Sequence, residues 1–370
     1  MIVENRFGKG ELYTIDEVYN EVGITGLVKV YCESTACMSV TSDMMSWVSS
    51  GEHRSKIAFV DMNKPGYNNV IIVLGCQVTD LAILNDINKA RALHEENPEA
   101  KVFMGGCLAY RFDIPLPGFI SRLGAVRTEY QEITPDGKRA VHWAKPFWVD
   151  SNKFDSENGD ELGEGHIFRD MYPLKIGAGC HGRCRYCTIR DTRGNSYETD
   201  AYLQVKEFIG HDDVVLISDS PTPKQIKDWC QLAIRYNKPI SIRNVEPSVV
   251  CQTFSELIDL AQYGLLHILH CPIQFPNVEV LRAMNRSTLD TVEFIGISRR
   301  LRSNGVLIAT NVIIDYTVPN TDGSVRTFPP LDTLWMHENF DYWSWNPYFD
   351  GHYDEQRAIE RWNKYLPNKI

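Results

Sequence analysis

The sequence lacks long apolar segments, basic tracts and a recognisable leader peptide. No run of about 18 apolar residues occurs in its 370 residues, so we expect no membrane-spanning helix. Its N-terminus does not show the basic and then apolar stretches of a secretory signal, and we therefore expect a cytoplasmic protein. The formal net charge is −10 and no block of basic residues occurs, although nucleic-acid-binding proteins usually carry one. These absences disfavour RNA as a partner, while a local basic cleft would still be compatible with it.

Cysteine, in contrast, is abundant, with ten residues in the chain. Structural disulfides are rare in a reducing compartment, so another role is expected. Three cysteines lie within a short stretch, at Cys180, Cys184 and Cys187, and the others are scattered. This distribution predicts one local metal motif and a second group of cysteines that folding brings together.

Alternating strand and helix patterns predict an α/β protein with two domains. In the first domain, residues 69–75 and 101–106 are strand-like and flank a helical pattern at 79–96, which makes a parallel βαβ unit. In the second, we expect strands at 174–177, 214–218, 240–243, 267–270 and 307–315, with helices near 201–209, 223–236, 252–262, 277–284 and 289–303. This repetition predicts a parallel barrel or part of one.

The expected domain limits follow from changes in composition along the chain. Residues 1–146 form the N-terminal α/β domain, 147–170 an acidic linker rich in Gly and Ser, 171–326 the barrel, and 327–370 a tail. The tail is aromatic and acidic and ends in a predicted helix at 353–365. Its aromatic side chains either stack on a substrate or cover an open edge of the barrel.

The three clustered cysteines form the motif Cys180-His-Gly-Arg-Cys184-Arg-Tyr-Cys187, which directly follows a predicted strand and a Gly-rich turn. Thiolates are the usual ligands of iron–sulfur clusters, and three of them leave one iron of a 4Fe–4S cluster open. This spacing is the signature of radical S-adenosylmethionine (SAM) enzymes. The alternatives are a zinc knuckle and buried structural cysteines; zinc needs a fourth ligand, for which the neighbouring His181 is badly oriented.

The sequence resembles the radical SAM methylthiotransferases, which modify tRNA or a ribosomal protein. The resemblance rests on residues 179–194 around the cluster motif, on His270-Cys-Pro-Ile-Gln274, and on Met284-Asn-Arg286. It implies a Rossmann-like parallel α/β domain followed by a partial (β/α) TIM-type barrel and here a short aromatic tail. It also implies SAM and two 4Fe–4S clusters as cofactors, and a reductant such as flavodoxin or ferredoxin as a partner.

The resemblance assigns the second cluster to three cysteines of the N-terminal domain, Cys37, Cys76 and Cys107, each after a strand. Cys32 lies close to Cys37 and is an alternative ligand. Residues at the ends of barrel strands or in the family motifs are candidates for SAM contacts: Tyr186, Ser218, Arg243, His270 and Gln274.

The sequence departs from the family in several places. Arg190 stands where the family has a proline, and we find no counterpart of the family's C-terminal β-barrel, which binds RNA or protein. The substrate therefore stays open between tRNA, a peptide or protein, and a small molecule. Two other functions also stay open: a radical SAM enzyme whose second cluster relays electrons or binds substrate, and a non-catalytic iron–sulfur or zinc protein.

Overall fold

The computed structural model shows two compact units. It describes residues 2–14, 17–18, 28–34, 57–59, 70–124, 167–168, 171–194, 196–320, 322–328 and 333–365. The first unit comprises residues 1–154, 188–195 and 351–370, and the second comprises residues 155–187 and 196–350. The chain therefore leaves the second unit directly after Cys187, contributes a short segment to the first unit, and returns.

The first unit contains a five-stranded sheet in the order β4-β3-β5-β6-β7, in which all neighbouring strands are parallel. Every residue of β5 is buried, as is typical of a parallel strand that is covered on both faces. Strands β1 and β2 form an antiparallel hairpin. The strands are β1 (Ile2–Asn5), β2 (Gly8–Glu11), β3 (Val28–Ser34), β4 (Ile57–Phe59), β5 (Val70–Gly75), β6 (Lys101–Gly106) and β7 (Ile120–Arg122).

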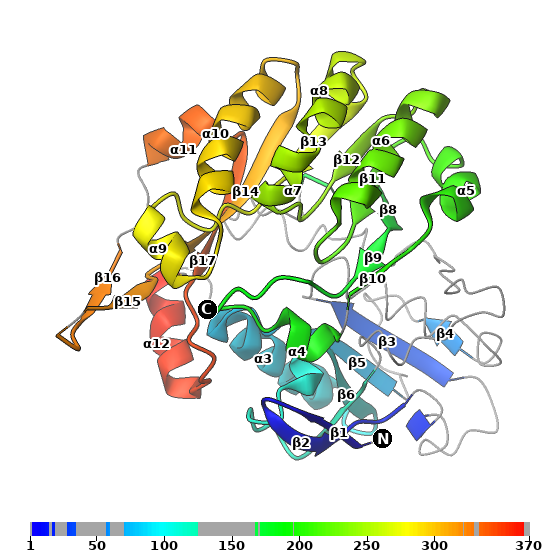
Figure 1. Cartoon of the computed structure of the whole chain (residues 1–370). Coiled ribbons are helices and arrows are strands. Elements are labelled where there is room, and N and C mark those ends of the chain that lie inside the picture. Colours follow the sequence, from blue (N-terminus) through cyan, green and yellow to red (C-terminus); the bar gives the residue numbers. More distant parts are fainter. Residues whose placement is uncertain are drawn as a thin grey trace. The chain divides into compact units, whose positions relative to one another are not determined.

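Helix α3 (Asp80–Glu96) joins β5 to β6 and completes the predicted βαβ unit. It begins after Thr79, whose hydroxyl accepts a backbone N–H of the first turn at 3.1 Å. Helix α12 (Glu355–Tyr365) lies beside α3 (Figure 1). Arg361 Nη1 of α12 pairs with the buried carboxylate of Asp80 at 2.7 Å. The predicted terminal helix is thus part of the first unit, where Arg361 provides a counterion for the buried carboxylate of Asp80 in α3.

The second unit contains a six-stranded, fully parallel sheet in the order β17-β14-β13-β12-β11-β8. Helices α6, α8 and α10 run along one face of this curved sheet (Figure 1). The open, curved arrangement confirms the predicted partial barrel. Its strands are β8 (Tyr172–Lys175), β11 (Val214–Ile217), β12 (Ile240–Ile242), β13 (Leu266–His270), β14 (Leu307–Ile314) and β17 (Tyr342–Pro347).

The remaining elements are mostly helices that connect these strands. Two short antiparallel pairs join β9 (Gly177–Ala178) to β10 (Tyr197–Glu198) and β15 (Thr317–Pro319) to β16 (Val325–Thr327). Among the described residues, no helix has the length and apolar character needed to cross a membrane. The helices of the second unit are η5 (Ala201–Gln204), α5 (Val205–Ile209), α6 (Pro223–Tyr236), α7 (Pro247–Gln252), α8 (Phe254–Gln262), α9 (Val278–Ala283), α10 (Thr288–Arg302) and α11 (Thr333–Asn339).

Helix α6 shows why the helix limits were predictable. Thr222 and Gln225 form a capping box, and Pro223 occupies the first helical position. The helix ends at Asn237, which adopts the left-handed conformation with φ 49°. These local signals fix both ends at the predicted residues 223 and 236.

Strand β17 is an element that the sequence did not predict. It lies in the aromatic segment and pairs with β14 along its whole length, so it forms one edge of the sheet. Trp343 of this strand is buried and its ring contacts His337 of α11 edge-on, with 4.5 Å between ring centroids. Part of the predicted tail therefore extends the sheet, and Trp343 packs against α11.

Candidate metal centre

The cluster motif lies in the loop that follows β8 and the short strand β9. Gly179 precedes the first cysteine with φ 75°, a conformation that glycine adopts without strain. Its N–H donates to Asp219 Oδ2 at 2.8 Å, which ties this loop to the loop after β11. The motif is therefore held at the carboxyl edge of the parallel sheet, where α/β proteins place their sites.

The thiols of Cys180 and Cys184 lie on the same side of the loop. A Cβ atom added at Gly182 would lie 3.1 Å from Cys180 Sγ and 4.0 Å from Cys184 Sγ. The N–H of Gly182 donates to Cys180 Sγ at 3.2 Å, and the N–H of Cys187 donates to Cys184 O at 3.1 Å. Burial raises the pKa of the Cys180 thiol. A partly buried thiol of this kind is a poor nucleophile by itself and becomes a thiolate beside a bound cation, which fits a metal ligand.

Arg286 is the buried cation of this site. Its side chain is 4% exposed, and Nη1 lies 3.6 Å from Cys184 Sγ and 3.3 Å from Tyr186 Oη. It makes a two-pronged ion pair with Glu246, at 3.2 and 2.5 Å, and Nη2 also donates to Pro272 O at 2.9 Å. The guanidinium is thus fixed in a geometry that stabilises negative charge on the Cys184 sulfur.

The two residues before Arg286 hold the backbone of the cluster loop. Met284 O accepts the N–H of Arg185 at 3.0 Å, and Asn285 Nδ2 donates to Arg183 O at 2.9 Å. The Met-Asn-Arg segment was noted in the sequence, but no role was assigned to it. The contacts of this segment become visible only in the folded protein, where α9 lies beside the cluster loop. The contacts that Glu246 and Asp219 make near the loop are likewise visible only in the structure.

A pocket of about 340 Å³ opens next to the cluster loop. Cys184, Ser220, Glu246 and Arg286 belong to its wall, together with the turns that begin α6, α7 and α10. The volume is in the range of small-molecule sites. The pocket combines a half-buried thiol, a charged pair and hydroxyl groups, which suits a small polar ligand bound at the open side of a metal centre.

Ser218, Arg243 and His270 all lie at the carboxyl ends of neighbouring strands, β11, β12 and β13. Ser218 is buried, and its hydroxyl accepts the N–H of Ser220 at 3.3 Å. Arg243 is buried as well, with its guanidinium 5.9 Å from the ring centroid of Phe168. The fold therefore brings these three candidates to one edge of the sheet.

His270 is fully buried, and both ring nitrogens are engaged by the protein. Nδ1 accepts the N–H of Asn244 at 3.1 Å, so the ring proton lies on Nε2, which donates to Asn311 Oδ1 at 3.1 Å. Asn311 also accepts from Ser344 Oγ at 2.8 Å. Gln274 follows with φ 66°, and its backbone bridges to β14. Both residues thus fix the strand ends around the site.

In the first unit, Cys76 and Cys107 follow adjacent parallel strands. Gly75 and Gly106, which precede them, are paired in register, so the two cysteines leave the sheet at the same edge. Gly106 has φ 70°, and a Cβ at Gly75 would lie 2.7 Å from the Met104 sulfur, so both positions require glycine. The in-register pairing of β5 and β6 therefore places the starts of the two cysteine loops side by side.

The third predicted ligand, Cys37, lies outside the described residues. The alternative, Cys32, lies inside β3, where its backbone pairs with Ile72. Cys76 follows Ile72 by four residues, which corresponds to about 13 Å along a strand. Cys32 is therefore set back from the edge at which Cys76 leaves the sheet, whereas Cys37 follows the end of β3.

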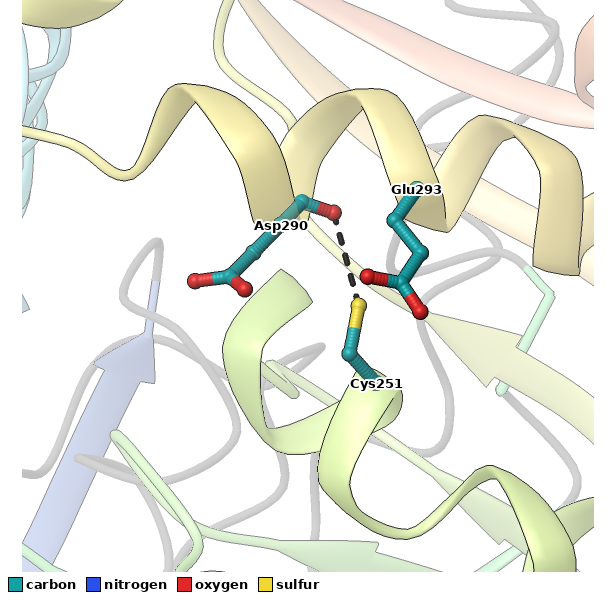
Figure 2. Close-up of side chains that lie close together, drawn as sticks. All are labelled: Cys251, Asp290 and Glu293. Atoms are coloured by element: carbon teal, nitrogen blue, oxygen red, sulfur yellow. Dashed lines mark hydrogen bonds between the residues drawn. The ribbon is translucent and has the colours of Figure 1, made fainter.

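Three further cysteines of the described residues lie in the second unit. Cys230 and Cys271 are buried in its core. Figure 2 shows Cys251 of α7 beside Asp290 and Glu293 of α10. Burial and these two carboxylates raise the pKa of Cys251 to about 12, and its thiol donates to the Asp290 carbonyl at 3.5 Å. Cys251 is therefore a protonated thiol that packs between α7 and α10.

Comparison with known proteins identifies the second unit. Residues 174–323 match the model of the Radical SAM superfamily. The chain contains a radical SAM domain. This match agrees with the cluster motif and with the parallel sheet around it, and it places 4Fe–4S and SAM chemistry in this domain.

Known relatives extend across both units at low identity. The chain is 23% identical over 331 residues to a tRNA-2-methylthio-N(6)-dimethylallyladenosine synthase from Ectopseudomonas mendocina, covering 78% of this chain and 69% of the relative. It is 25% identical to a probable threonylcarbamoyladenosine tRNA methylthiotransferase from Methanothermobacter thermautotrophicus, covering 83% and 74%. These similarities confirm the resemblance to radical SAM methylthiotransferases.

A solved structure supports the architecture. The radical SAM methyltransferase TsrM from Kitasatospora setae aligns with a TM-score of 0.50 and 11% identity, covering 88% of this chain and 77% of that chain. At this identity, the similarity shows a shared fold and nothing about the reaction.

Proposed function

We propose that the protein is a radical SAM methylthiotransferase that uses two 4Fe–4S clusters. Cys180, Cys184 and Cys187 would hold the cluster of the radical SAM domain, and Cys37, Cys76 and Cys107 would hold the auxiliary cluster. The observation that carries the proposal is the in-register pairing of Gly75 and Gly106, which presents Cys76 and Cys107 together at one sheet edge. A radical SAM domain alone has no need for this second pair.

The radical SAM cluster, when reduced and bound to SAM, supplies the electron that produces the 5′-deoxyadenosyl radical. The protein positions and shields this chemistry. Arg286 stabilises the Cys184 thiolate, and the ion pair with Glu246 keeps its guanidinium in place. Arg243 would pair with the SAM carboxylate through its guanidinium, and Ser218 would offer a hydroxyl near the same edge. The Tyr186 hydroxyl accepts a hydrogen bond from Arg286 Nη1, which ties the cluster loop to this ion pair.

The complete reaction would consume two SAM molecules for each product. One would methylate a sulfide at the auxiliary site and yield S-adenosylhomocysteine. The other would yield methionine and 5′-deoxyadenosine, after the radical has removed a hydrogen atom from an unactivated C–H bond of the substrate. The substrate carbon radical would then form a C–S bond to the methylated sulfide, and the one electron released in this step would pass to the auxiliary cluster that Cys37, Cys76 and Cys107 would hold. An external one-electron donor such as flavodoxin or ferredoxin would start the cycle.

Two observations favour different classes of substrate. The relatives are named for tRNA modification, which favours tRNA. The net charge of −10 favours a peptide, a protein or a small molecule. The decisive comparison is mass spectrometry of tRNA and of small proteins from cells with and without the gene, in search of a methylthio group in place of a hydrogen.

Anaerobic reconstitution tests the cluster assignment. The protein should bind about eight irons, and Cys184→Ala and Cys76→Ala should each lower this to about four. SAM with a deuterated methyl group should transfer the label into the product. Transfer of no label would instead support a relay role for the second cluster, and one zinc without 5′-deoxyadenosine would support a non-catalytic protein.

A further inference from the structure

Helix α4 (Ile189–Arg193) connects the radical SAM motif to the first unit. It begins two residues after Cys187, yet it packs with the 3-10 helix η2 (Cys107–Tyr110) of the first unit. Arg6 pairs with Asp191 of α4 at 3.1 Å and holds it from another side. The segment that directly follows the radical SAM cysteines therefore belongs to the unit that carries the auxiliary cysteines.

A buried hydrogen bond joins α4 to the Cys76 loop. Gln77 is 1% exposed, Thr192 is fully buried, and Gln77 Nε2 donates to Thr192 Oγ1 at 2.9 Å. The hydroxyl proton of Thr192 points back to the α4 backbone, to Thr188 O at 3.3 Å or Ile189 O at 3.4 Å. The Thr192 lone pair is thus available to Gln77.

The hydrogen bond between Gln77 and Thr192 is important to the Cys76 loop because, in the described part of the chain, the other polar atom of the Gln77 amide is not hydrogen-bonded. Its Oε1 atom is buried and has no hydrogen-bond partner among the described residues. Without Thr192, the whole amide would be buried and unsatisfied, which is unfavourable enough to move the side chain and the loop.

The Cys76 loop is held by two polar contacts from different segments. Asp86 of α3 accepts the N–H of Cys76 at 2.6 Å, and Thr192 of α4 accepts from Gln77. The next residue, Val78, is 56% exposed. The first contact fixes the backbone of the cysteine, and the second fixes the direction in which the chain continues.

We propose that Thr192 is a positioning residue for the auxiliary cluster: through Gln77 it orients the loop that carries Cys76. The inference rests on the proposed function, since it assumes that Cys76 is a cluster ligand. Thr192, which follows Cys187 of the radical SAM motif by five residues, would thus help to position a ligand of the auxiliary cluster. Hydrogen-bonded partners next to metal ligands commonly tune affinity and electronic properties in this way.

The test isolates the auxiliary cluster by using Cys184→Ala protein as the parent. In that parent we would compare Thr192→Val, which loses the hydroxyl at constant shape, with Thr192→Ser, which retains it. Gln77→Leu removes the other partner, and Val78→Ala is the control in the same loop. The measurements are iron per chain, the EPR spectrum of the reduced protein, and the concentration of an iron chelator that removes half of the iron.

Thr192→Val and Gln77→Leu should shift the EPR signal and lose iron at about tenfold lower chelator concentration. The double variant should resemble the single variants, and Thr192→Ser and Val78→Ala should resemble the parent. An unchanged spectrum and unchanged chelator sensitivity in Thr192→Val would overturn the positioning role while leaving the proposed function intact. An iron-free Cys184→Ala parent would overturn the proposed function itself, and this inference with it.

Discussion

Replacing Arg361 by Ala should destabilise the first unit strongly and in a pH-dependent manner. The Asp80 carboxylate is 0% exposed, and its partner Arg361 Nη1, 2.7 Å away, comes from α12. Burial raises the pKa of Asp80, and Arg361 opposes this rise. Without Arg361 the carboxylate would be left without its nearest counterion in a buried site, which is costly.

An upper limit for this cost follows from protonation. The variant can always neutralise Asp80, and each pH unit above the ordinary pKa of 3.8 costs about 1.4 kcal/mol. The limit is therefore about 4 kcal/mol at pH 7 and about 2 kcal/mol at pH 5, before any contribution of lost packing. A raised folded-state pKa means that stability is present at low pH and lost as pH rises, so the deficit must be larger at pH 7 than at pH 5.

Urea unfolding followed by circular dichroism at both pH values measures this difference. The matched control is Arg91→Ala, because Arg91 and Glu355 join the same two helices with side chains 38% and 46% exposed. That exposed pair should contribute less than about 1 kcal/mol, with little pH dependence. Equal losses at pH 5 and pH 7 in Arg361→Ala, or no loss at all, would refute the reasoning.

Three further predictions concern the metal sites. Gly75→Ala should destabilise by about 1–3 kcal/mol and lower the iron content, because the new Cβ would meet a side-chain sulfur at 2.7 Å, whereas Gly118→Ala, with nothing within 4 Å, should do neither. Arg286→Lys should make the radical SAM cluster lose iron at about tenfold lower chelator concentration, since Lys cannot reproduce the two-pronged pair with Glu246. Cys251→Ser should leave the iron content unchanged; a loss of iron would show that this cysteine is more than a packing residue.

Much of the fold was predictable because its signals are local. Helix α6 carries its own capping box and C-terminal Asn, and the strands on both sides of α3 are continuous apolar runs. Strand β17 was not predictable in the same way. Trp343 and Trp345 alternate with Ser344 and Asn346, as in a strand, but this pattern is only a few residues long, and pairing with β14 is what makes the segment an edge strand.

In the candidate site, too, some features follow from the local sequence and others only from tertiary contacts. The sequence by itself determined the cysteine motif, because the spacing of Cys180, Cys184 and Cys187 places three thiols in one loop. Local backbone geometry likewise favours glycine before Cys107, where Gly106 has φ 70°, whereas glycine is needed at Gly75 because of its tertiary contact with Met104 of the neighbouring strand. Tertiary structure alone decided which distant groups meet these cysteines. Arg286 reaches Cys184 across about a hundred residues, and Thr192 reaches Gln77 across a similar gap. No sequence pattern encodes such contacts, because they depend on how separate strands and helices pack.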